Sequence, residues 1–201
     1  MKIGIPCAAL VLLAAGCGPE ATQMGVSGLA PDESRPTAEL CIPPINRDIA
    51  LTAAASRDRL QATVIGANCE AATLLLTLRK ADGALLWTHS IRATDTWAFV
   101  PADDSKPVVP AEGMASFLAD VFKNVRIEKT GAGPDWPKGA ERPEDPSGLY
   151  YVSPLPREAY LILRQKNVPM TCVQAEMGTS YCVAFDPEFN DVANTFYSAS
   201  S

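Results

Sequence analysis

The alternation of apolar and polar residues between positions 60 and 91 predicts three consecutive β-strands. Apolar and polar residues alternate over 60–67 and more regularly over 73–79, as in strands with one buried face. Asp82-Gly83 then separates the second segment from the apolar run 84–91, and Asp-Gly between two apolar runs is a strong hairpin signal. We therefore expect an antiparallel three-stranded meander over 60–91.

A stripe of apolar residues at helical spacing follows and predicts an amphipathic helix over 111–124. The stripe comprises Met114, Phe117, Leu118, Val121, Phe122 and Val125. The opposite side, with Asp120, Lys123 and Asn124, is not basic enough for a helix that lies on a membrane surface. We therefore expect the stripe to pack against a core.

Cap signals predict two further helices, one on each side of a second hairpin. Ser153-Pro154 offers an N-cap serine and a proline at the first helical position, and this helix should end within 167–169. Segments 170–173 and 181–185 flank a polar turn, as hairpin strands would. Asp186-Pro187 repeats the cap signal and predicts a short last helix. Its expected apolar face comprises Phe189, Val192, Ala193 and Phe196.

The order of these elements predicts an α+β fold with a mainly antiparallel sheet and two to three helices. The sheet would combine the three-stranded meander with the second, disulfide-stapled hairpin. Between the first two helices lies a long loop, 128–148, that is rich in glycine and proline. Loops of this length are usually functional or lack fixed structure.

The N-terminal residues have the pattern of an export signal. Lys2 precedes an apolar run over 5–15, and the small pair Ala15-Gly16 stands directly before Cys17. The run is shorter than the roughly 20 apolar residues that span a bilayer, and it has the form of a secretory signal. Its small-small-cysteine ending resembles the lipobox of bacterial lipoprotein precursors.

That resemblance implies acylation of the Cys17 thiol, cleavage before Cys17 and acylation of the new amine. Gly18 occupies the position where aspartate would favour the inner membrane, which by resemblance to diderm lipoproteins implies the outer membrane, on its periplasmic or its surface face. The alternatives are an ordinary cleaved signal and an uncleaved N-terminal anchor. The resulting organisation is a signal peptide over 1–16, a lipidated flexible tether over 17–40 and a single α+β domain over 41–201.

The charge balance disfavours nucleic acid as a partner. Cleavage after residue 16 leaves 16 basic and 23 acidic residues, a net charge of −7. An acidic protein gains nothing from the release of counterions by phosphates.

Four cysteines remain in the expected domain after Cys7 leaves with the signal and Cys17 is acylated. An oxidising compartment makes two disulfides the expected state, and zinc is disfavoured by the absence of a Cys-x-x-Cys pair. Cys172 and Cys182 lie on opposite strands of the second hairpin and should pair. Cys41 and Cys69 would then form the other disulfide.

The sequence predicts no catalytic, metal or cofactor site. The lone histidine, His89, lies in an expected strand and no nucleophile motif accompanies it. The acidic pairs Asp103-Asp104 and Glu144-Asp145 read as solvated loop charges, although two carboxylates could serve glycoside hydrolysis. A calcium-loop pattern that starts at Asp186, Glu188 and Asn190 fails at its sixth and twelfth positions.

We therefore expect a non-catalytic lipoprotein of the outer membrane whose domain binds an envelope protein or a cell-wall component. A carboxylate-dependent envelope hydrolase and a structural cell-wall component are the alternatives. Trp136, in the loop 128–148, is the candidate partner contact, because tryptophan is enriched among residues that dominate interfaces. The competing interpretation is that Trp136 packs on its own domain.

Overall fold

The computed structural model describes residues 39–101, 103, 105–145, 150–176 and 179–199. The expected signal peptide, Cys17 and nearly all of the tether lie outside the described residues. The described residues form nine strands, two α-helices and two short 3-10 turns, η1 (Ala93–Asp95) and η2 (Thr130–Ala132). The helices are α1 (Ala111–Lys123) and α2 (Arg157–Lys166). The strands are β1 (Leu40–Ile49), β2 (Asp58–Ile65), β3 (Thr73–Arg79), β4 (Leu85–Arg92), β5 (Arg126–Lys129), β6 (Tyr150–Val152), β7 (Pro169–Glu176), β8 (Thr179–Asp186) and β9 (Asp191–Ala199).

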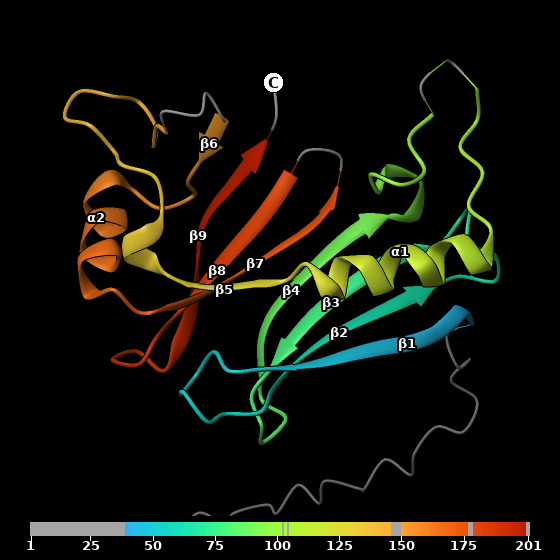
Figure 1. Cartoon of the computed structure of the whole chain (residues 1–201), viewed down its shortest axis with the longest axis horizontal. Helices are drawn as coiled ribbons and strands as arrows, with labels where there is room; N and C mark the ends of the chain where they lie inside the picture. The colour runs from blue at the N-terminus through green and yellow to red at the C-terminus, as the bar shows by residue number, and fades with distance from the viewer. Residues whose placement is uncertain (1–38, 102, 104, 146–149, 177–178, 200–201) are drawn as a thin grey trace, which may run out of the picture. The chain divides into compact units, whose positions relative to one another are not determined.

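The strands form two antiparallel sheets (Figure 1). The meander sheet has the order β1-β2-β3-β4, so the expected meander corresponds to β2, β3 and β4, and β1 extends it. The five-stranded sheet has the order β5-β7-β8-β9-β6. Its central hairpin, β7–β8, pairs Cys172 with Cys182.

The predicted α+β fold is wrong, because the domain is mostly β and resembles a sandwich of two antiparallel sheets. The expected last helix is strand β9, which pairs with β8 along its length. A β-bulge between Cys182 and Val183 shifts the register there, so the spacing of apolar residues along β9 imitates that of a helix. Residues 126–129 and 150–152 at the two ends of the predicted long loop are strands β5 and β6.

Two cores lie on opposite faces of the five-stranded sheet. The larger core joins the meander sheet, α1 and the face of β7 and β8 that carries Val173 and Val183. The smaller core lies under α2, on the face that carries Met170 and Cys182. Figure 1 shows α1 along the meander sheet and α2 beside the five-stranded sheet. The apolar stripe of α1 is buried as expected.

Two disulfides brace the domain, and both join the expected pairs. Cys41 is bonded to Cys69, with 5.2 Å between their Cα atoms, and this bond links β1 to the turn before β3. Cys172 is bonded to Cys182 across the β7–β8 hairpin, with 4.1 Å between the Cα atoms. Within the described part of the chain, neither helix has the length and apolar character needed to cross a membrane.

Candidate functional site

Helix α2 and the β8–β9 turn form the walls of the candidate site. The helix begins at Arg157, four residues after the expected N-cap Ser153. Ser153 instead accepts a hydrogen bond from the backbone N–H of Leu155 and donates one to the carbonyl of Thr195 on β9, at 2.6 Å. Three non-helical residues, 154–156, therefore precede α2, and Leu155 becomes part of the wall.

The C-terminal end of α2 is held in place by one buried hydroxyl. Thr130 donates a hydrogen bond from its hydroxyl to the carbonyl of Leu163 at 2.8 Å and accepts one from the backbone N–H of Val168 at 3.1 Å. Asn167 adopts the left-handed conformation (φ 51°), which ends the helix and turns the chain into β7. These contacts fix the position of α2 relative to the five-stranded sheet.

A mostly apolar groove of about 550 Å³ lies between α2 and β9. Its apolar lining comprises Leu155, Ala159, Ile162 and Leu163 from the α2 side, and Phe189, Val192 and Ala193 from the β8–β9 side. Ile162 is 50% exposed and Phe189 is 71% exposed, so two large apolar side chains face solvent at the groove. Sites of about 300–1,000 Å³ with mainly apolar walls are typical for ligands and peptide anchors.

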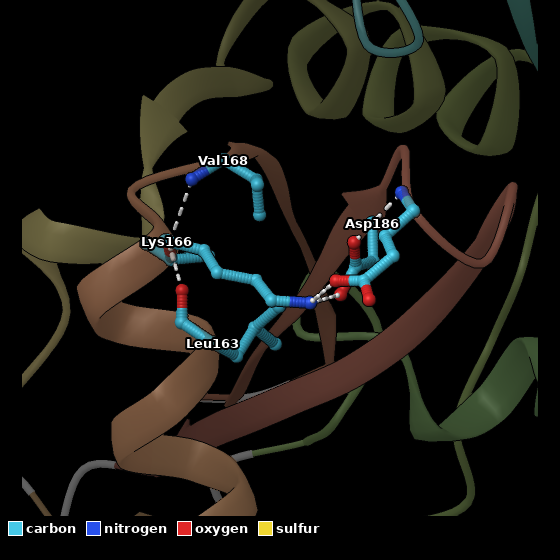
Figure 2. Close-up of polar contacts among 6 residues, drawn as sticks. Leu163, Lys166, Val168 and Asp186 are labelled. Atoms are coloured by element: carbon cyan, nitrogen blue, oxygen red, sulfur yellow. Dashed lines mark hydrogen bonds and ion pairs between the residues drawn. The ribbon is translucent and has the colours of Figure 1, made fainter.

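Charged side chains close one end of this groove. Lys166 donates hydrogen bonds of 2.7 Å to both Asp186 and Glu188, and its ammonium lies 5.0 Å from the centre of the Phe189 ring. Figure 2 shows the Lys166 side chain reaching from α2 to Asp186. The hydrogen bonds to Asp186 and then to Glu188 raise the pKa of Lys166, so it is charged at neutral pH.

The charged end of the groove has an excess of negative charge. Asp191 also lines the groove, so three carboxylates face one ammonium, and the net charge is −2. The fifth position of the failed calcium pattern, Asn190, instead accepts a hydrogen bond of 2.6 Å from Lys80. The groove thus combines an apolar floor with an acidic end.

Trp136, the expected partner contact, lies in the smaller core and is only 9% exposed. Its ring packs edge-to-face on Tyr160 of α2, 5.5 Å between centroids, and its indole N–H donates to the carbonyl of Ala140 at 3.0 Å. The backbone carbonyl of Trp136 accepts a hydrogen bond from Arg157. Trp136 therefore covers its own domain, which is the alternative that the sequence left open.

The acidic pairs from the sequence occupy separate places. The carboxylate of Asp103 accepts a hydrogen bond from the backbone N–H of Ser105, and Asp104 lies outside the described residues. The backbone of Glu144 pairs with that of Asp135 in an isolated bridge. Asp145 lines a different, polar cleft on the five-stranded sheet.

His89 lies where the two sheets meet. Its ring is 3.9 Å from that of Tyr181 on β8 and 5.8 Å from that of Trp87, centroid to centroid. Within the described part of the chain, its Nε2 is buried and has no hydrogen-bond partner. Burial lowers the pKa of His89, and the negative charge of Glu176 opposes this shift only in part. Tyr181, which donates a hydrogen bond to Glu176, also faces the ring.

Acidification below pH 6.5 should therefore destabilise the domain through His89. The unfolded histidine, with a pKa of about 6.5, takes up a proton at a pH at which the folded histidine is still neutral. Its contribution to stability is thus complete above about pH 7 and is lost as the pH falls from 6.5 through the lower folded pKa. Urea unfolding at pH 7.5 and 5.5 should show a smaller loss in His89→Phe than in the natural chain. Equal losses in both chains would contradict this assignment.

The groove is not apparent from the sequence. Its helix side could have been noticed, because Ala159, Ile162 and Lys166 follow one another at helical spacing. The strand side could not, because the Asp186-Pro187 cap signal predicts a helix around Phe189. Comparisons of the chain with protein-family models, with curated proteins and with solved structures find no match.

Proposed function

We propose that this chain is an exported lipoprotein, anchored in the outer membrane through acylated Cys17, whose β-rich domain is a non-catalytic binding module. The support for the anchor is the N-terminal pattern: Lys2, the apolar run 5–15 and the small pair before Cys17. Two or three acyl chains give lasting attachment to a membrane, whereas one chain binds only marginally. The acidic domain itself gains nothing from anionic lipid, which leaves it free to face a partner.

The observation that carries the binding function is the open apolar groove between α2 and β9. Large exposed apolar side chains cost solubility unless a partner covers them, and the exposed side chains of Ile162 and Phe189 both line the groove. The walls are fixed before binding by the Thr130 hydroxyl and by the ion pairs of Lys166. A preformed groove loses little conformational entropy on binding, which favours affinity.

The charge at the end of the groove defines the chemistry of the occupant. The surplus of two carboxylates favours a cation, so the partner is an envelope protein that presents an apolar segment with an adjacent lysine or arginine. An acidic segment would be repelled there. Charge complementarity of this kind sets specificity and the association rate more than affinity.

Ile162→Asp tests this function. The substitution places a charge on the apolar wall, and a buried unpaired charge in the complex should lower partner capture at least tenfold. Since Ile162 is 50% exposed, the melting temperature should stay nearly unchanged. The measurement is crosslinking capture from the native envelope by the full-length lipidated chain. Leu85→Asp is the matched control, because Leu85 is 53% exposed on β4 in the other sheet. Equal capture by the two variants would contradict the groove as the binding site.

A further inference from the structure

A second, polar cleft lies on the five-stranded sheet, apart from the groove. Its volume is about 680 Å³, within the range of about 300–1,000 Å³ found for small-ligand sites. All five strands of the sheet contribute to its lining. The polar lining residues are Arg126 and Glu128 on β5, Gln174 on β7, Ser180 on β8, Ser198 on β9, Tyr151 on β6, and Asp145.

The strand register places four of these side chains in one continuous row. Gln174 is paired with Ser180, Ser180 with Ser198, and Ser198 with Tyr151. Residues paired directly across antiparallel strands lie on the same face of a sheet. Next to the Gln174–Ser180 pair on this face lies the Cys172–Cys182 pair, which belongs to the apolar smaller core. The face therefore changes from apolar under α2 to a row of hydrogen-bonding groups in the cleft.

The wall of the cleft is held in place from behind by α2. The Tyr160 hydroxyl donates a hydrogen bond to the carbonyl of Pro134 at 2.7 Å, and Arg164 donates one to the carbonyl of Gly133 at 3.1 Å. A side chain at position 133 would have its Cβ only 3.2 Å from the ring of Phe196 and from the Tyr160 hydroxyl. Glycine at this position lets the wall approach the sheet closely.

The chemistry of the cleft restricts its ligand. A guanidinium, an amide and three hydroxyls can donate hydrogen bonds, while the amide, the hydroxyls and the carboxylates of Glu128 and Asp145 can accept them. Arg126 forms an ion pair with Glu128 at 3.1 Å, and both lie near Tyr151. Burial raises the pKa of Tyr151, and the negative charge of Asp145 raises it further. The two carboxylates outnumber the single guanidinium, so an anionic ligand is disfavoured. The edge-to-face pair of Tyr151 and Phe196, which are 9% and 8% exposed, adds an apolar part to the lining.

We propose that this cleft is a binding site for a neutral oligosaccharide. Sugar hydroxyls donate and accept hydrogen bonds at neighbouring positions, which a row of serine, amide and tyrosine groups matches. The apolar faces of sugar rings contact aromatic side chains, and Tyr151 and Phe196 both line the cleft. The proposal is independent of the groove between α2 and β9, because the two sites have no lining residue in common.

An NMR titration tests the site through amide chemical shifts. The purified, lipidated full-length chain is titrated with two neutral tetrasaccharides, one of N-acetylglucosamine and one of glucose. Shifts at residues 174, 180 and 198 with at least one of them are the expected result, and tetragalacturonate, an acidic tetrasaccharide, should bind at least tenfold more weakly. The double variant Gln174→Ala/Ser180→Ala should lose about tenfold in affinity, because two hydrogen bonds to the ligand are removed. Both variant positions lie outside the cores, so the melting temperature should not change.

Ser90→Ala, at an exposed serine of β4, is the matched control and should bind as the natural chain does. The proposal is overturned if neither neutral sugar shifts these amides, if the acidic sugar binds as tightly, or if the double variant keeps full affinity.

Discussion

Replacing Trp136 by alanine is expected to lower the free energy of unfolding by about 3–5 kcal/mol. The substitution removes an almost completely buried indole and leaves a cavity between the 133–145 segment and α2. It also removes the edge-to-face contact with Tyr160 and leaves the carbonyl of Ala140 without the indole N–H. For a domain of this size the melting temperature should fall by about 6–20 °C.

Thermal unfolding followed by circular dichroism measures this effect. Trp136→Phe is the control, because it keeps an aromatic ring against Tyr160 and loses only the hydrogen bond to Ala140 and part of the ring volume. Its destabilisation should be about 1–2 kcal/mol. A Trp136→Ala chain that melts within about 1 °C of the natural chain would show that the indole does not brace the domain.

Cys17→Ser should move nearly all of the chain from the membrane fraction to the soluble fraction or leave an unprocessed precursor. Without the thiol the proposed acyl chain cannot be attached, and an acidic domain is not attracted to anionic lipid headgroups. Fractionation combined with labelling by a palmitate analogue measures both the location and the acylation. Cys7→Ser is the matched control, because Cys7 lies in the proposed signal peptide, and this variant should stay lipidated and membrane-bound. A processed Cys17→Ser chain that still fractionates with membranes would refute the anchor.

The parts of the fold that sequence could predict depend on local patterns. The strands β2 to β4 alternate between the two faces of the sheet, and the stripe of α1 faces the larger core throughout its length. Asp82-Gly83 marks the turn between β3 and β4 without help from the rest of the chain. The disulfide of Cys172 and Cys182 followed from the short hairpin that contains both.

The errors in the fold arise where a strand departs from regular geometry. Strand β1 contains Pro43 and Pro44 and shifts its register between Leu40 and Ile45, so no alternation marks it. In β9 a bulge imitates helical spacing, and the Asp186-Pro187 cap signal in fact begins a tight β8–β9 turn. There the Asp186 carboxylate accepts a hydrogen bond from the backbone N–H of Glu188, as it would at the start of a helix.

The two candidate binding sites could not be predicted because each depends on tertiary packing. The groove joins α2 to a turn more than 20 residues further along the chain, and Ile162 and Phe189 line one groove only when the chain has folded and β9 pairs with β8. The polar row of the cleft depends on strand register, which a single sequence does not specify. Trp136 illustrates the opposite case, since its position in a Pro/Gly-rich segment suggested exposure while Tyr160 and Arg157 hold it in the core.

Site-specific photocrosslinking from the groove is the most direct test of the proposed binding function. A photoreactive amino acid at position 162 of the full-length lipidated chain, activated in intact cells, should yield one dominant crosslinked product, whereas the same amino acid at position 85 should not. Mass spectrometry should place the crosslink in an apolar segment of an envelope protein with an adjacent lysine or arginine. A crosslinked segment that is acidic or polar, or equal products from positions 162 and 85, would contradict the groove as the binding site of this protein.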